Sequence, residues 1–109
     1  MNLENGEPFP LGQRRFAGVV VTNYLYRPLL DQLVSAVGAP GALLYETFAV
    51  RNERLGRPTR PEFLLRPGEL LDVVRGRLRV VAFEDRVVDD PRPAAVQRIA
   101  AVRDPEDAR

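Results

Sequence analysis

Two groups of side chains stand where apolar runs of the sequence end, and their positions make them the first candidates for chemistry. The groups are Thr22, Asn23 and Tyr24 after one run, and Glu46, Thr47 and Phe48 after the next. In open α/β sheets, ligands bind beyond the carboxyl ends of the strands. We therefore expect these side chains to line a binding site. A chain also becomes polar simply where it leaves a core, and that interpretation stays open.

The residue types that are missing limit the chemistry further. The chain has 109 residues and contains no His and no Cys. Imidazole bases, thiol nucleophiles, disulfides and zinc sites of the usual ligands are therefore excluded. A reaction would have to use carboxylate, Tyr, Arg, amide or backbone groups. We predict no metal site and assign no catalytic residue.

A third candidate is the basic segment 50–63, in which Gly and Pro residues prevent a regular helix or strand. Its charged residues are Arg51, Arg54, Arg57 and Arg60, with Glu53 and Glu62 among them. Loops longer than about 12 residues in compact domains are usually functional or disordered. A solvated surface connection explains the segment equally well. The net charge of +1 and the scarcity of aromatic residues among the arginines do not favour nucleic acid as a partner.

The elements that would position these residues are strands and helices in alternation. Continuous apolar runs predict strands at 16–24, 42–48 and 78–84, and helical spacing predicts helices at 28–37 and 67–75. The segment 95–102 mixes residues that favour helix with residues that favour strand, and we expect it to return as an antiparallel strand. We place turns at 38–41 and 85–93. The predicted fold class is α/β, a mostly parallel open sheet with an antiparallel strand at one edge.

Length and termini indicate one cytoplasmic domain. A chain of 109 residues supports a single compact domain over 1–109. We expect an N-terminal loop at 1–15, where Gly and Pro recur, and a frayed tail at 104–109. The polar, acidic N-terminus is not a secretory signal, and no apolar run reaches the roughly 20 residues that cross a bilayer. We therefore expect no membrane contact.

Several segments together resemble class I S-adenosylmethionine-dependent methyltransferases, especially the small-molecule type related to tellurite-resistance methyltransferases. The segment 16–25 is similar to the family's fourth strand and the motif at its end, and 39–48 to its Pro-Gly-Gly turn and fifth strand. The segments 52–58 and 63–71 resemble the chain that follows, and 96–102 resembles the final antiparallel strand. Ala42 stands where that turn has its second Gly.

The resemblance covers only the C-terminal half of that partial Rossmann-like fold. The glycine-rich cofactor loop and the acidic residue that binds the ribose have no counterpart, although 1–4 looks like the end of the third strand. The strand at 16–24 would then lack the first strand as its neighbour, and its free edge is one that another chain can pair with. A homodimer, a separate N-terminal half or the N-terminal loop could cover this edge.

The resemblance also implies roles for the candidate residues. Thr22, Asn23, Tyr24 and Leu25 would line S-adenosylmethionine, and the residues facing a small methyl acceptor would be Glu46, Thr47, Phe48, Asn52, Arg54 and Arg57. The expected function is that of a truncated or split methyltransferase with little or no activity alone. The alternative is a non-enzymatic α/β module that binds a protein partner through the free strand edge or the basic segment.

Overall fold

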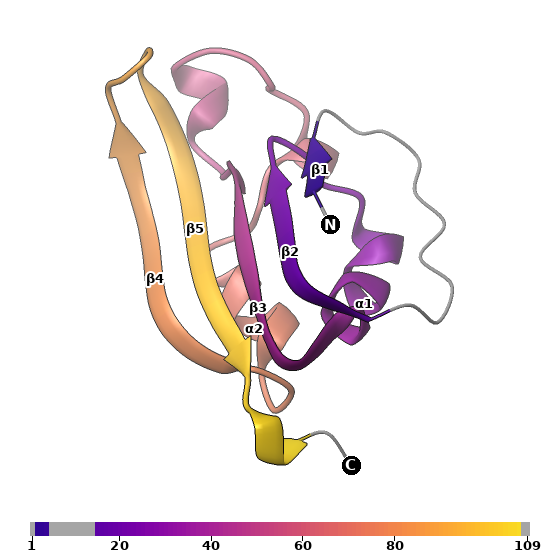
Figure 1. Ribbon diagram of the computed structural model, residues 1–109. Helices are drawn as coiled ribbons and strands as arrows, with labels where there is room; N and C mark the ends of the chain where they lie inside the picture. Colours follow the sequence, from indigo (N-terminus) through magenta and orange to yellow (C-terminus); the bar gives the residue numbers. More distant parts are fainter. Residues whose placement is uncertain (1, 5–14, 108–109) are drawn as a thin grey trace.

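One mixed sheet forms the centre of the molecule. The computed structural model describes residues 2–4 and 15–107, and within them five strands lie in the order β1-β2-β3-β5-β4 (Figure 1). The strands are β1 (Asn2–Glu4), β2 (Phe16–Thr22), β3 (Val37–Phe48), β4 (Arg79–Val88) and β5 (Ala94–Arg103). β1, β2 and β3 pair in parallel, and β5 is antiparallel to both β3 and β4. The predicted α/β class is confirmed.

Helix α1 (Arg27–Ser35) connects β2 to β3 and confirms the predicted strand–helix–strand unit. Pro28 lies in its first turn, where the missing N–H costs nothing. Its buried side chains are Leu29, Leu30, Leu33 and Val34, the apolar positions that predicted the helix. Because these four residues share one face, the helix packs onto the sheet along a single stripe.

The predicted turn at 38–41 lies inside β3, which begins at Val37 and not at residue 42. The reason is that Phe16 already pairs with Val37, and the ladder resumes only at the pair of Gly18 and Ala42. Between these pairs the backbone folds tightly: a Cβ on Gly41 would lie 2.4 Å from the carbonyl oxygen of Gly38. The strand is therefore longer than predicted, with an irregularity where the sequence suggested a turn.

The segment between β3 and the second helix is irregular, as predicted, except for two short 3-10 turns at Asn52–Arg54 and Pro61–Phe63. Helix α2 (Glu69–Val74) follows and is shorter than the predicted 67–75. Gly68, which precedes it, has φ +70°, a conformation that glycine adopts without strain. The helix therefore starts one residue after this glycine.

The hairpin of β4 and β5 corrects two predictions. β4 continues past residue 84 to Val88, because Glu84 and Arg86 keep pairing with β5 across an exposed surface. The antiparallel strand β5 lies between β3 and β4, and not at the edge of the sheet. β5 buries more of its residues than β4 because it has a neighbour on each side.

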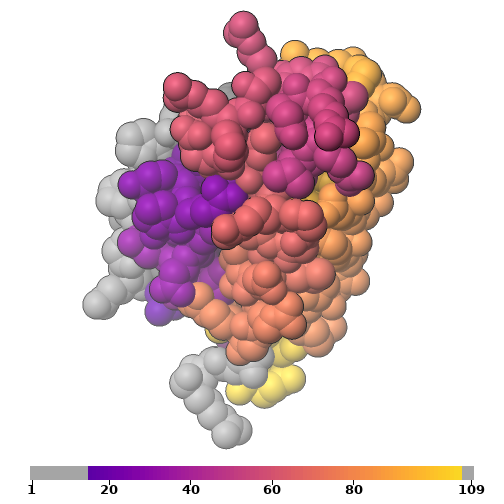
Figure 2. Space-filling model, turned by 180° about the vertical axis from the view of Figure 1, so that it is seen from behind, coloured from indigo at the N-terminus to yellow at the C-terminus, as the bar shows by residue number. Residues whose placement is uncertain are grey.

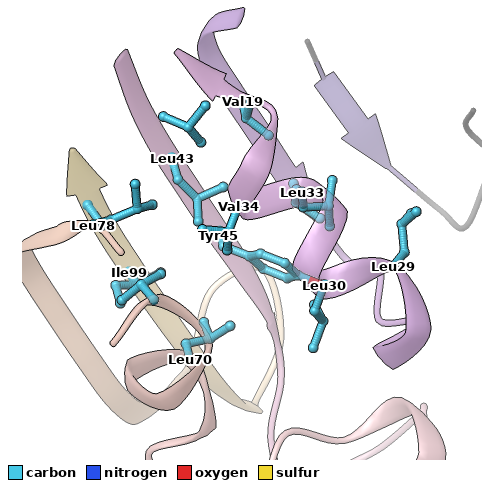
Figure 3. Packing of buried hydrophobic residues seen from close by; sticks show 14 of the residues in the cluster. Val19, Leu29, Leu30, Leu33, Val34, Leu43, Tyr45, Leu70, Leu78 and Ile99 are labelled. Atoms are coloured by element: carbon cyan, nitrogen blue, oxygen red, sulfur yellow. The ribbon is translucent and has the colours of Figure 1, made fainter. Parts of the chain in front are cut away.

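The core lies between the two helices and one face of the sheet (Figure 3). Leu33 of α1 and Leu70 of α2 belong to the same buried cluster as Leu43 of β3 and Ile99 of β5. Seen from behind, the helices cover this face (Figure 2). The residues that alternate with the core positions point to the other face, where Leu44 is 49% exposed.

Both termini differ from the predicted loops in their described parts. The N-terminal loop predicted at 1–15 includes β1, which pairs with Val20, Val21 and Thr22 of β2; residues 5–14 lie outside the described residues. In the tail predicted at 104–109, Asp104 accepts hydrogen bonds from Arg79 at 2.9 and 3.0 Å, and a 3-10 turn follows at Pro105–Asp107. Residues 108–109 lie outside the described residues. Among the described helices, none has the length and apolar character to span a bilayer.

Candidate functional site

The carboxyl end of β2 turns sharply at Asn23. This residue has φ +54°, a left-handed conformation that Asn tolerates better than most residues. Its backbone N–H donates to the carbonyl oxygen of Glu46 at 3.0 Å, while its side chain stays exposed. Thr22, half-buried, pairs with Glu46 across the sheet. The structure therefore brings the predicted ends of the first two long strands together.

Tyr24 and Leu25 continue from this turn toward the core. Leu25 is only 6% exposed and belongs to the core cluster, and Tyr24 packs against that cluster. The hydroxyl of Tyr45 donates to the carbonyl oxygen of Tyr24 at 2.7 Å. Burial, and to a smaller extent the neighbouring Tyr24, raises the pKa of the Tyr45 phenol above its ordinary value. The pKa of Tyr24 is also raised, mainly by burial and to a smaller extent by Tyr26. Both phenols are therefore neutral near pH 7 and do not serve as bases.

The end of β3 presents its residues to both faces. Glu46 lies on the face without helices and forms an ion pair with Arg98 of β5, which also contacts Glu84. Thr47 is 2% exposed and points toward the helices, and Phe48 is half-buried. Of these three predicted acceptor contacts, Glu46 and Phe48 remain accessible beside the turn at Asn23.

Asn52 has a role in holding the basic segment that the sequence did not reveal. It is 1% exposed; its side-chain oxygen accepts from the N–H of Ala95 at 3.0 Å, and its amide nitrogen donates to the carbonyl oxygen of Pro58 at 3.1 Å. Arg54 and Arg57 are exposed. Asn52 therefore fixes the loop against β5, and the two arginines face solvent.

Two buried polar groups position α2: Gln97, which sequence reasoning missed, and Glu69, whose place at the start of the predicted helix indicates a structural role. The side-chain oxygen of Gln97 accepts from the N–H of Leu70 at 3.3 Å, and its amide nitrogen donates to the carbonyl oxygen of Arg66 at 2.6 Å. The carboxylate of Glu69 accepts two hydrogen bonds from Arg27, at 2.8 and 2.9 Å, and one from the N–H of Arg66 at 2.8 Å. Burial alone would raise the pKa of Glu69, but these hydrogen bonds and charges hold it below its ordinary value.

The signal for Gln97 was a single amide in an apolar run, and for Glu69 its place at the start of a helix. Both groups are fully used by neighbouring atoms, so they are structural. Among residues 2–4 and 15–107, no group of three or more acidic residues could hold a metal ion.

The strand order, with an antiparallel strand next to the edge of an otherwise parallel sheet, defines a methyltransferase-like α/β fold. The chain is similar in structure to TehB from Haemophilus influenzae, with a TM-score of 0.64 at 11% identity over 87% of this chain and 39% of that one. A point mutant of the 16S rRNA (adenine(1408)-N(1))-methyltransferase from Catenulisporales acidiphilia gives 0.53 at 15% identity, over 88% of this chain and 53% of that one. The same enzyme solved with cosubstrate SAM gives 0.50 at 16% identity, over 80% and 49%.

These comparisons show the fold. No family model and no curated sequence matches the chain. The chain spans 39–53% of the length of these three solved structures. In each of them, therefore, about half of the length or more lies outside the match.

Proposed function

We propose that this chain is the C-terminal half of an S-adenosylmethionine-dependent methyltransferase of the tellurite-resistance-like, small-molecule type, in a truncated or split form with little or no activity alone. The observation that carries the proposal is the likeness to TehB, which extends over 87% of this chain but only 39% of that one. A half-domain explains both the agreement in fold and the difference in length.

The residues at the end of β2 fit one wall of a cofactor site. Asn23 offers an exposed amide at a backbone turn that the contact with Glu46 holds in place, and Tyr24 offers a half-buried ring beside it. The core position of Leu25 supports this turn from below. The described residues at this end include no glycine-rich loop. The opposite wall would come from another chain segment.

The acceptor would lie at the same end of the sheet. Glu46, Phe48 and the exposed guanidinium groups of Arg54 and Arg57 are candidates for contacting it; Thr47 and Asn52 would act only through the backbone that they hold. S-adenosylmethionine, when bound, supplies a methyl group for in-line displacement at its sulfonium. Such a reaction depends on positioning more than on acid–base groups. The absence of His and the neutral tyrosines are therefore compatible with it.

The missing half would join at the edge of β2. The described strand on this edge is β1, which has three residues and pairs with Val20, Val21 and Thr22. A separately encoded N-terminal half, or a second copy, would pair a longer parallel strand with β2 in place of β1. The same observation favours the second candidate function, a non-enzymatic module that binds a protein partner by strand addition.

Titration of S-adenosylmethionine into the 15N-labelled chain tests the cofactor wall. We expect saturable changes in the amide resonances of residues 22–25 and of Glu46. Asn23→Gly should weaken these changes, because it removes the side-chain amide while glycine adopts the same left-handed backbone conformation without strain. Gln32→Ala, which removes an exposed amide on α1, is the matched control and should leave the changes intact. A folded chain whose resonances do not respond would reject the cofactor wall and leave the interaction module.

A further inference from the structure

The face of the sheet opposite α1 and α2, here named the helix-free face, presents an ordered pattern of side chains. α2 lies behind the sheet in Figure 1, and β3 and β5 run through the middle of the face. The residues of β3 and β5 on this face include Ala42, Leu44, Glu46, Arg98, Ala100 and Val102. All-parallel sheets are usually covered on both faces, and β1, β2 and β3 form the parallel part of this mixed sheet. Leu44, 49% exposed, therefore lies where a protein of this class has a covering layer.

Three successive rows of the two central strands match each other in size or in charge. Leu44 stands opposite Ala100, and Ala42 opposite Val102, so each of these rows has one large and one small apolar residue in reversed order. In the next row Glu46 stands opposite Arg98, one negative and one positive group. A second copy, turned by 180° about an axis that lies over this face and runs parallel to the two strands, presents a pattern complementary to that of the first copy.

We propose that the helix-free face is the interface of a homodimer. The two-fold axis lies in the plane of the interface, parallel to the strands, over the line midway between β3 and β5. This axis exchanges the two strands across the interface, because a two-fold contact places the same patch on both subunits. Leu44 of one copy then covers Ala100 of the other, Ala42 covers Val102, and Glu46 faces Arg98. The proposal concerns the face of the sheet and does not depend on the methyltransferase proposal, which concerns the edge of β2 and its carboxyl end.

The outer strands and the overall charge agree with this arrangement. Val20 of β2 and Ala82 of β4 extend the row of Leu44 and Ala100 to the two neighbouring strands. In the dimer, Val20 of one copy would therefore lie over Ala82 of the other. Glu84 of β4 continues the charged row and would lie over Thr22 of the other copy. Because the net charge is only +1, two copies repel each other weakly.

The size of the face predicts a dimer of moderate affinity. Four strands about 4.8 Å apart, with about eight residues each at about 3.3 Å, cover roughly 500 Å² in projection. Specific interfaces at the small end bury about 600 Å² per partner. We therefore expect dissociation in the micromolar range, visible as a concentration dependence of the mass.

Analytical ultracentrifugation of the full chain, from about 1 to 200 μM, measures this equilibrium. Leu44→Arg places a charge at the centre of the interface and should weaken the dimer at least about 100-fold. Leu55→Arg is the matched control, because Leu55 is 41% exposed in the basic segment and off the sheet. It should leave the equilibrium unchanged. Far-UV circular dichroism verifies that both variants fold.

A charge exchange tests the orientation of the two copies. Glu46→Arg alone, or Arg98→Glu alone, places like charges against each other and should weaken the dimer about 10-fold, whereas the double exchange should restore it. A wild-type chain that stays monomeric up to 200 μM overturns the proposal, as does a dimer that Leu44→Arg and Leu55→Arg affect equally. A dimer that survives Leu44→Arg has its contact elsewhere on the molecule and also overturns the proposal.

Discussion

The contact between Glu69 and Arg27 ties α2 to α1, and its removal should lower the free energy of unfolding by about 2–3 kcal/mol near pH 7. The side chain of Glu69 is 9% exposed, and removing one partner of a buried pair typically costs about 3–5 kcal/mol. Arg27 is 31% exposed, so water partly replaces its lost partner. Glu69→Gln keeps the shape of the side chain and removes only its charge.

The pH dependence of this variant gives a sharper test than its stability alone. Because the folded pKa of Glu69 lies below its ordinary value, the carboxylate stabilises the fold at every pH above the unfolded pKa, about 4.3. This contribution fades as the pH falls from about 5 through the lowered folded pKa. Gln does not titrate. The difference between wild type and Glu69→Gln should therefore be largest near pH 7 and shrink toward acid pH.

Urea unfolding at a fixed protein concentration, followed by far-UV circular dichroism, measures both effects. Glu62→Gln is the matched control, because the Glu62 carboxylate is 58% exposed and lies 3.8 Å from Arg60. An exposed pair of this kind contributes under about 1 kcal/mol. A loss below about 0.5 kcal/mol for Glu69→Gln, or a loss that stays constant down to pH 3, would refute the reasoning.

Two further substitutions test the other polar contacts that join helices to strands. Gln97→Leu leaves the buried backbone N–H of Leu70 without its acceptor, while the carbonyl of Arg66 keeps the N–H of Glu69 as a donor, and calorimetry should show a loss of about 1–3 kcal/mol. Arg103→Met removes two hydrogen bonds of 2.9 Å to the carbonyl oxygens of Val34 and Val37. We expect a loss of about 1–2 kcal/mol in urea unfolding and faster hydrogen exchange in the last turn of α1; unchanged exchange there would contradict this role.

The elements that sequence could predict are those whose pattern is local. The run at 16–22 is nearly continuously apolar with β-branched residues at 19–22, and α1 has its leucines at helical spacing. Neither signal needs a partner strand to be interpreted. The segment 94–103 carried no such signal, because its Ala, Gln and Arg favour helix while Val and Ile favour strand. Pairing with both β3 and β4 makes this segment a strand, and its partners in β3 lie 48–62 residues away in the sequence.

The candidate site was predictable to a similar extent. The position of Asn23 and Glu46 at the ends of adjacent strands follows from topology, and their hydrogen bond confirms that they meet. The burial of Asn52 could not be anticipated, because a polar residue in a charged loop gives no sign that a distant N–H, that of Ala95, needs an acceptor. Its predicted contact with a methyl acceptor stays a prediction.

The place of β5 in the sheet constrains the order in which the molecule can assemble. β5 follows every other strand in sequence, yet it lies between β3 and β4 and joins them. Until synthesis has passed residue 103, β3 exposes an unpaired edge and the strand 79–88 has no neighbour to pair with. Contacts this distant in sequence make folding slow and leave strand edges open to aggregation. A nascent chain of this protein therefore leaves these strand edges unpaired until residues 94–103 have emerged from the ribosome.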